Sequence, residues 1–561
     1  MSTMLKHWSV FLLLTTISAC GGNDSKPSKE QITQLDLKRG ALISCGSPGK
    51  EFGTVDFEMS CDEKVKTDFN LAIELLHSFE YDESEKVFAK IIDEAPECAM
   101  AYWGVAMCSY HPLWEPPSEA DLKKGAEAIT IAKSINKKSE KESAYINAIA
   151  AYYKDWDKTN PLARSINFEK AIEQLHNTYP QDKEAAIFYA LALDAAANPT
   201  DKTYVKQKKA GDILNALYAE EPNHPGIIHY IIHTYDYPEL ATLALPAARR
   251  YATVAPSSAH ALHMPSHIFT RLGLWDECIK SNLESVAAAQ CYAESAGIKG
   301  HWDEELHGVD YVVYAYLQKG DDDSAKQQFN YLSMIKEVHP ANFKVAYAFA
   351  AIPARIALET KNWSDAANLQ LPQLNLAWNK FPWQEAIIHF ARLLGSVKSQ
   401  KIDAAKNELI KLNALHDTLQ QQKDAYKANQ VAIQIKTGEA WIILAEGKKA
   451  EALQLMKTAA DMEDSTTKHP VTPGEVLPAR ELYADMLLQL DQNENALREY
   501  EAVLNKNPNR FNSLYGAGAA AGRVGDDNKK TMYYKQLYTI AGKTPGRTEL
   551  TAVKSFLNIP L

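Results

Sequence analysis

Eight of the 16 histidines in this 561-residue chain are concentrated between residues 224 and 307. They are His224, His229, His233, His260, His263, His267, His301 and His307. The neutral imidazole ring is the commonest metal ligand in proteins, and it also exchanges protons near neutral pH. This concentration predicts a functional site in the middle third of the chain.

The spacing of these histidines places them on shared helical faces. His229 and His233 are four residues apart, and His260, His263 and His267 are spaced by three and four. Side chains at these spacings project from one face of a helix. We therefore expect the two sets to face one groove. His307 and Asp310, three residues apart on the next predicted helix, are expected to face the same groove. The predicted metal ligands are His229, His233, His260, His263, His267, His307 and Asp310.

Several transition metals would suit such a site, with zinc, copper and iron as the leading candidates. In a metalloenzyme, Asp310 or Glu304 would be the expected base for a metal-bound water. The segment His229–His233 lacks the glutamate of the HExxH motif, so a zinc peptidase is not supported. The alternative is that the histidines are buried structural residues that hydrogen-bond to neighbouring tyrosines and aspartates. No catalytic residue is assigned.

Other common chemistries are absent from the sequence. It contains no phosphate-binding P-loop, no GxSxG nucleophile motif and no dinucleotide-binding glycine pattern. The net charge is −11, whereas nucleic-acid-binding proteins more often carry a basic excess. We therefore expect no nucleic-acid partner.

The elements that must position the histidines are helices, which the hydrophobic periodicity predicts from about residue 62 onward. A small residue, a larger apolar residue, another apolar residue and a proline recur at offsets of four, three and five. The sets are Ala496, Tyr500, Val503 and Pro508; Ser84, Phe88, Ile91 and Pro96; Ala210, Leu214, Leu217 and Pro222; and Ala244, Ala248, Tyr251 and Pro256. The small residue lets two helices approach closely, and the proline ends the second helix.

This pattern resembles the tetratricopeptide repeat, a pair of antiparallel helices in about 34 residues. The resemblance implies an all-α, right-handed superhelical solenoid of about eight to ten helix pairs, whose first helices line a concave surface. Three segments also look like those of uncharacterised repeat-containing bacterial lipoproteins, for which no activity is established. They are Cys98–Met107, His224–His233 and His260–Phe269.

Two stretches interrupt the periodicity. His111–Pro117 reads HPLWEPP and is expected to form a loop between repeats. Gly300–Glu305 is polar apart from Trp302, and we expect a solvated loop there. The alternative for the second stretch is that it closes over the histidine groove.

The N-terminus resembles a bacterial lipoprotein leader. A weakly basic start is followed by the short apolar run Trp8–Ile17 and then by Ser18, Ala19 and Cys20. The resemblance implies that Cys20 carries lipid, and Gly21 in place of aspartate implies the outer membrane. An ordinary signal peptide cut near Ala19 is the alternative. We expect a protein of the cell envelope that contacts the membrane through its lipid anchor only.

Seven cysteines are present, and six remain once Cys20 is set aside. Disulfides form in the oxidising compartment expected for an exported chain. The candidate pairs are Cys45 with Cys61, Cys61 with Cys98, and Cys278 with Cys291. No CxxC motif exists, so a cysteine zinc site is not expected.

These observations predict the domain organisation. A signal peptide (1–19) and a lipid-tether linker (20–35) precede an irregular cap (36–61), an N-terminal array with the histidine-rich face (62–340) and a C-terminal array (341–561). The first functional hypothesis is a scaffold that binds a protein, peptide or small ligand through this groove. The second is a metal-binding protein or metal-dependent enzyme, and the third is a lipoprotein of glycan uptake.

Overall fold

A computed structural model describes residues 26–45, 52–114, 116–198, 200–374, 376–542, 544 and 546–560. Helices make up nearly all of the regular structure in these ranges, which confirms the all-α class. The strands found there are β1 (His301–Trp302) and β2 (Val338–His339), which pair in parallel. The predicted signal peptide and Cys20 lie outside the described residues.

The N-terminal half begins with a short helix inside the predicted linker, α1 (Lys29–Gln34). The described residues of the predicted cap, 36–45 and 52–61, contain no helix or strand. The helices that follow are α2 (Lys66–His77), α3 (Tyr81–Glu94), α4 (Ala99–Cys108), α5 (Glu119–Ser134), α6 (Glu140–Tyr153), α7 (Pro161–Thr178), α8 (Lys183–Ala195), α9 (Val205–Tyr218), α10 (Pro225–Thr234), α11 (Ala241–Val254), α12 (Ala259–His263), α13 (Pro265–Leu272) and α14 (Trp275–Ser295).

The second half continues the same architecture. Its helices are α15 (Asp303–Gln318), α16 (Asp322–Met334), α17 (Phe343–Glu359), α18 (Trp363–Ala367), α19 (Pro382–Lys398), α20 (Ile402–Gln421), α21 (Ala425–Ala445), α22 (Lys449–Ser465), α23 (Ala479–Gln489), α24 (Asn493–Lys506), α25 (Phe511–Arg523), α26 (Asp527–Ala541) and α27 (Thr548–Phe556). Two 3₁₀ turns, Glu63–Val65 and Trp378–Lys380, precede α2 and α19.

Consecutive helices pack against one another as pairs, from α2 with α3 through α25 with α26. Two aromatic residues of the recurrent sets pack closely against a glycine of the following helix. Gly104 in α4 packs against the ring of Phe88, and Gly516 in α25 packs against the ring of Tyr500. A methyl group at either glycine would overlap the ring, so a larger residue would push the neighbouring helices apart.

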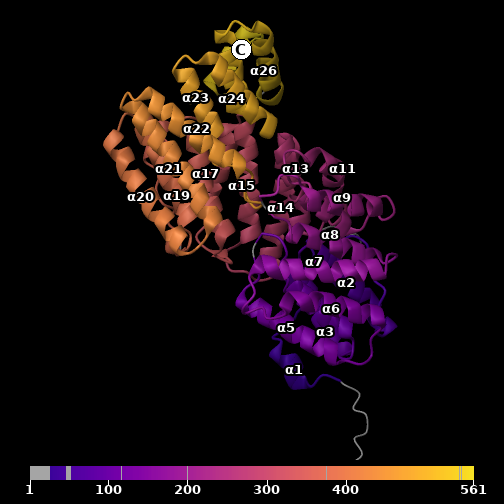
Figure 1. Cartoon of the computed structure of the whole chain (residues 1–561). Helices are drawn as coiled ribbons and strands as arrows, with labels where there is room; N and C mark the ends of the chain where they lie inside the picture. The colour runs from indigo at the N-terminus through magenta and orange to yellow at the C-terminus, as the bar shows by residue number, and fades with distance from the viewer. Residues whose placement is uncertain are drawn as a thin grey trace, which may run out of the picture.

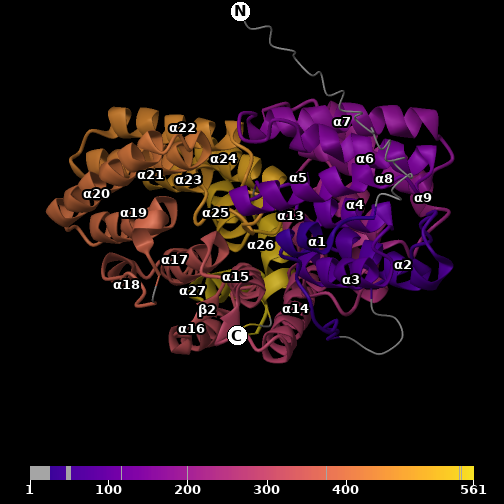
Figure 2. The ribbon, with the colours of Figure 1, turned by 90° about the horizontal axis from the view of Figure 1, so that it is seen from below.

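The two halves lie on either side of α13, α14 and α15 (Figures 1 and 2). They also touch directly, because the indole N–H of Trp275 in α14 donates to the carbonyl of Asn509, 2.9 Å away. The Asn509 side chain in turn donates to the carbonyl of Gly273 at 3.0 Å. These contacts bring the C-terminal array back onto the helices that carry the histidines. No helix among the described residues is long and apolar enough to span a bilayer.

Two disulfide bonds tie the N-terminal segment to the helices. Cys61 bonds to Cys98, which was one of the candidate pairs, and Cys45 bonds to Cys291 in α14. The candidate pairs Cys45–Cys61 and Cys278–Cys291 are wrong. Cys278 is instead a buried thiol in the helical core. The Cys45–Cys291 pair spans 246 residues and depends on where the segment before residue 46 crosses α14, which sequence spacing does not reveal.

Candidate metal centre

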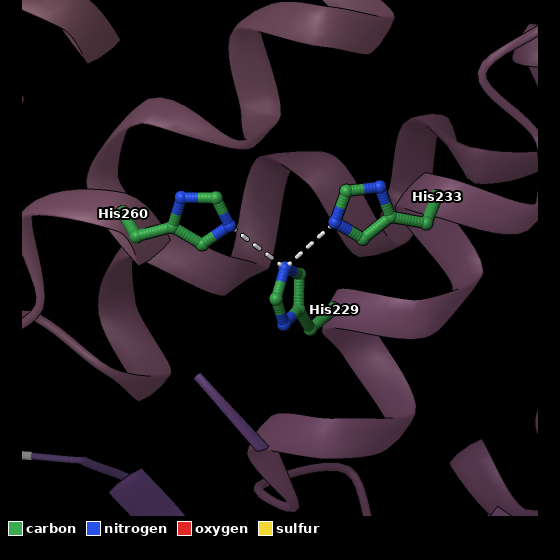
Figure 3. Close-up of side chains that lie close together, drawn as sticks. All are labelled: His229, His233 and His260. Carbon is green, nitrogen blue, oxygen red and sulfur yellow. Dashed lines mark hydrogen bonds between the residues drawn. The ribbon is translucent and has the colours of Figure 1, made fainter. Parts of the chain in front are cut away.

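Three imidazole rings meet where α10 faces α12, and we call His229, His233 and His260 site A. The first two lie one turn apart on α10, and His260 is in the first turn of α12 (Figure 3). His229 Nε2 lies 3.0 Å from His233 Nε2 and 3.2 Å from His260 Nε2. One nitrogen from each ring lies within 4.8 Å of the other two.

A second group of three histidines lies beside the first, and we call His263, His267 and His307 site B. They come from α12, α13 and α15. His263 Nε2 lies 3.0 Å from His267 Nε2, and the rings of His263 and His307 have centroids 4.2 Å apart. One nitrogen from each ring again lies within 4.8 Å of the others.

The sequence run HALHMPSH contributes histidines to both sites and is broken by a proline. Pro265 lacks a backbone N–H and occupies the first turn of α13, so α12 ends at His263. The Ser258 side chain accepts from the backbone N–H of Ala261 and caps the start of α12. His260 and His263 both lie on α12, before this break, yet His260 belongs to site A and His263 to site B, so the division between the sites falls within α12. The sites adjoin, since the ring centroids of His260 and His263 are 6.5 Å apart.

Hydrogen bonds on the outer side of the rings fix which nitrogen carries the proton. His229 Nδ1 donates to the carbonyl of His77 at 2.6 Å, and His263 Nδ1 donates to Asn282 Oδ1 at 2.6 Å. The Asn282 amide is held in this orientation because its Nδ2 donates to the carbonyl of Cys278 at 2.8 Å. In both neutral rings the inward Nε2 therefore carries a lone pair, as metal ligation requires.

His267 completes this arrangement at site B. Its Nδ1 donates to Asp236 Oδ2 at 3.0 Å, so its Nε2 lone pair faces that of His263 at 3.0 Å. Two facing lone pairs repel unless a cation lies between them. Two nitrogens bound tetrahedrally to one zinc ion at 2.0–2.1 Å would be about 3.4 Å apart. The observed separations are close to this value, so a small adjustment would admit an ion.

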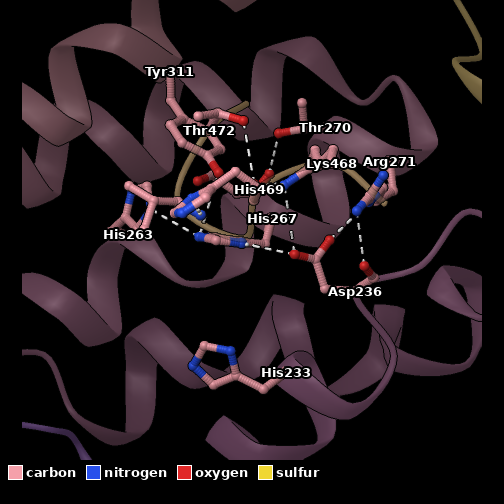
Figure 4. A network of polar contacts seen from close by, with 12 residues as sticks. His233, Asp236, His263, His267, Thr270, Arg271, Tyr311, Lys468, His469 and Thr472 are labelled. Atoms are coloured by element: carbon pink, nitrogen blue, oxygen red, sulfur yellow. Dashed lines mark hydrogen bonds and ion pairs between the residues drawn. The ribbon is translucent and has the colours of Figure 1, made fainter. Parts of the chain in front are cut away.

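Asp236 is itself held by positive charge (Figure 4). Arg271 Nε donates to Asp236 Oδ1 at 2.8 Å, and Lys468 Nζ lies 3.7 Å from Oδ2. Burial alone would raise the pKa of Asp236, but Lys468, Arg271 and His267 together hold it well below its usual value. The carboxylate stays charged and supports the His267 ring, as outer partners do at metal sites.

We predict that Asp236→Asn will weaken metal binding at site B by about 10- to 100-fold, the usual cost of losing an outer carboxylate. The substitution keeps the size of the side chain but leaves Arg271 and Lys468 facing His267 without a counter-charge. Competition with a coloured chelator would measure the affinity. Asp194→Asn is the matched control, because Asp194 is a buried aspartate whose pKa burial raises to about 8. An equal loss in both variants would contradict the prediction.

Burial makes the histidines of both sites neutral. It lowers the pKa of His229 to about 3, and it lowers the pKa values of the other site residues in the same direction. A neutral imidazole keeps the lone pair that a metal ion needs. The rings can therefore act as ligands across the physiological pH range.

The lowered pKa of His229 also predicts how stability depends on pH. Below about pH 6.5 the unfolded chain binds a proton at this histidine that the folded chain does not, so acid favours unfolding. This loss continues until the pH falls through the folded value of about 3. In the presence of chelator, we expect the stability advantage of the wild type over His229→Gln to fall by about 1.4 kcal/mol per pH unit below pH 6.5. Denaturant unfolding at pH 7.0 and 5.5 would measure it, and a constant difference would contradict it.

A third group, His77, Glu184 and His224, differs from sites A and B because its hydrogen bonds are complete. Both histidines donate from Nε2 to Glu184 at 2.9 Å. Tyr230 donates to His77 Nδ1 at 2.9 Å, and the backbone N–H of Ile227 donates to His224 Nδ1 at 3.4 Å. No lone pair in this group faces another, so we assign it a structural role between α2, α8 and α10.

Two expectations from the sequence require correction. Asp310 is not a ligand: it forms a buried ion pair with Arg355, and burial raises its pKa to about 6 despite that partner. The histidines also do not line an open groove, since five of the six are buried. The rings of Phe79 and Trp114 cover site A, with centroids 4.4 Å from His229 and 5.4 Å from His233 respectively.

Several residues that complete the site gave no signal in the sequence. His77 supplies the carbonyl behind His229, Asn282 lies behind His263, and Lys468 reaches Asp236 from the C-terminal half. Each lies at least 19 residues from its partner, and none shares a periodic pattern with it. Glu304, the other expected base, forms an ion pair with Lys344.

No protein-family model and no curated protein matches this sequence. Solved helical structures are similar to it at low identity. Yeast Tom70 has 12% identity and a TM-score of 0.34, with 89% of this chain and 96% of that chain covered. IFIT1 has 9% identity and a TM-score of 0.34, with 86% of this chain and 98% of that chain covered. The TPR domain of P58(IPK) has 12% identity and a TM-score of 0.19, with 83% of this chain and 99% of that chain covered. The function of this chain therefore has to be sought in its own residues.

Proposed function

We propose that this chain is a transition-metal-binding protein that holds one ion at site A and one at site B. The observation that carries the proposal is the contact between His263 Nε2 and His267 Nε2 at 3.0 Å, with both Nδ1 atoms already donating elsewhere. Imidazole ligands suit zinc, copper, iron and nickel. The hydrogen-bonded group around Glu184 supports the distinction, because it lacks such a contact.

Three histidine ligands leave room for a further ligand on a tetrahedral or five-coordinate ion. An ion bound in this way acts as a Lewis acid and can lower the pKa of a bound water. The chain's own residues would contribute orientation and charge: Asp236 supports His267, and Tyr311 lies with its hydroxyl 3.4 Å from His267 Nε2. A metal-dependent activity is therefore compatible with the site.

Elemental analysis of untagged protein purified without chelator tests the proposal. After incubation with Zn²⁺, Cu²⁺ or Fe²⁺ and removal of free metal, we expect two ions per chain. The double variant His229→Ala, His263→Ala should retain none. A wild-type protein that stays metal-free with all three ions would overturn the proposal.

We further propose that the protein acts in the cell envelope as a lipid-anchored protein. Support comes from the lipoprotein-like sequence ending at Cys20 and from the two disulfides, which suit an oxidising compartment. Labelling of cells with a radioactive fatty acid would test it. Label lost in Cys20→Ser supports the anchor, and label retained in that variant would exclude Cys20 as the site of attachment.

A scaffold that binds a protein or peptide is the second candidate function. A groove of about 800 Å³ lies along α16, α17 and α18, and its wall includes Phe329, Phe349 and Ile356. An apolar groove of this kind suits one face of an amphipathic partner helix. A photo-crosslinker at Lys336, on the same groove, would test it in cells. Crosslinks lost in Phe329→Asp would support this role, and unchanged crosslinks would exclude the groove.

A further inference from the structure

A cavity of about 190 Å³ lies beside site A, and His260 forms part of its wall. The two stretches that interrupt the repeats meet there. His111–Pro117 contributes Trp114, and Gly300–Glu305 contributes Trp302 and Glu304. Residues 111–114 of the first stretch and Gly300–Trp302 of the second lie outside the helices, whereas Asp303–Glu305 begin α15. Both stretches therefore reach the wall of a cavity that a candidate metal ligand also lines.

Aromatic rings form much of this wall. The Trp114 ring lies 5.7 Å from Phe79 and 5.8 Å from His260, between ring centroids. Trp302 is held in place by the β1–β2 pairing and by stacking on Tyr292 at 4.3 Å. Such surfaces favour a planar aromatic ligand, because ring pairs at these separations attract beyond simple burial.

Two residues with aromatic rings in the wall adopt a left-handed backbone conformation. Phe79 has φ +58° and His111 has φ +43°, and both line the cavity. This left-handed region is unfavourable for bulky residues and is usually filled by glycine or asparagine. Phe79 directly follows the C-cap of α2, the position at which Gln400, Lys423 and Asp491 adopt the same conformation after their own helices. Glycine would fit both positions more easily but would remove the rings from the wall.

The charges around the cavity disfavour an anionic ligand. Two carboxyl side chains, Glu80 and Glu304, and one lysine, Lys344, line the cavity. Lys344 donates to Glu304 Oε1 and also pairs with Asp303 at 2.6 Å, so its charge is already neutralised. A carboxylate accepts several hydrogen bonds at once, so Glu304 can still accept one from a ligand hydroxyl.

We propose that this cavity binds a small, neutral aromatic molecule carrying a hydroxyl group. The ring lies against Trp114 and Trp302, and the hydroxyl donates to Glu304. A contact between the ligand hydroxyl and an ion at site A would require the metal binding proposed above, so this part of the inference rests on the proposed function. The aromatic pocket itself does not depend on the metal.

Ligand-observed NMR with phenol as the probe tests the cavity in the full chain, with and without metal. We expect phenol to bind both forms, and benzoate and cyclohexanol to bind at least fivefold more weakly, since one is anionic and the other lacks an aromatic ring. Trp114→Leu should weaken phenol binding by about fivefold to tenfold. Trp156→Leu, which changes a partly buried tryptophan outside the cavity wall, should not.

The outcomes distinguish a failure of the cavity proposal from a failure of the metal-binding proposal. Phenol binding to wild type that is unchanged in Trp114→Leu, or no binding in either form, would overturn the cavity proposal even if two ions are present. If the protein takes up no metal under the loading conditions but still binds phenol, the cavity proposal is supported and the metal proposal is overturned. In Co²⁺-loaded protein, a phenol-induced shift of the visible bands, lost in His260→Ala, would show contact with site A, and unshifted bands with phenol bound would exclude it.

Discussion

Replacing His263 with alanine will leave a protein that retains one metal ion in place of two. The variant keeps His267 and His307 at site B, but two ligands cannot hold an ion through buffer exchange as three can. We expect affinity at site B to fall by more than the roughly hundredfold cost of losing an outer partner. Site A should keep its ion, because its three nitrogens come from other residues. Elemental analysis of wild type and variant measures the difference.

His301→Ala is the control for this experiment. His301 lies in the same histidine-rich stretch but pairs with Glu305 at 2.8 Å and belongs to neither site. It should leave the metal content at two ions, whereas His229→Ala should remove the ion at site A. If His301→Ala and His263→Ala lose metal equally, the assignment of ligands is wrong.

Arg510→Met is expected to lower the free energy of unfolding by about 3–5 kcal/mol. Arg510 is fully buried and donates to Glu359 and Glu481, at 2.6 Å and 2.8–2.9 Å. Its removal leaves two buried carboxylates without a counter-charge, which is far more costly than losing an exposed pair. Asn512 also donates to Glu359, at 2.8 Å, so the network joins α17 to α23 and α25.

Denaturant unfolding of Arg510→Met and of a matched surface variant tests this prediction. Arg523 is half-exposed and lies 3.4 Å from Asp491, so Arg523→Met should cost less than about 1 kcal/mol. A loss of similar size in both variants would contradict a central role for the buried network.

The fold class was predictable because its cause is local. Small residues such as Gly516 in α25 and rings such as Tyr500 in α24 meet between helices that are consecutive in the chain, so the signal repeats along the sequence. The grouping of the histidines was predictable in part for the same reason. His229 and His233 share a face of α10 through a spacing of four residues.

The division into two sites was not predictable from spacing. It depends on which neighbouring helix each ring of α12 meets: His260 lies against His229 and His233 of α10, whereas His263 lies against His307 of α15. The prediction that Asp310 is a metal ligand was wrong for a different reason. Its spacing from His307 is helical, but its partner Arg355 lies 45 residues away on α17. Contacts between distant helices are set by packing, to which the sequence pattern gives no access.

Crystallography with anomalous scattering at the absorption edge of the bound metal tests the central claim most directly. After loading with zinc, we predict two anomalous peaks, one bounded by His229, His233 and His260 and the other by His263, His267 and His307. Each peak should lie about 2.0–2.1 Å from the ligating nitrogens. No peak at either position, in crystals grown with excess zinc at neutral pH, would contradict the account.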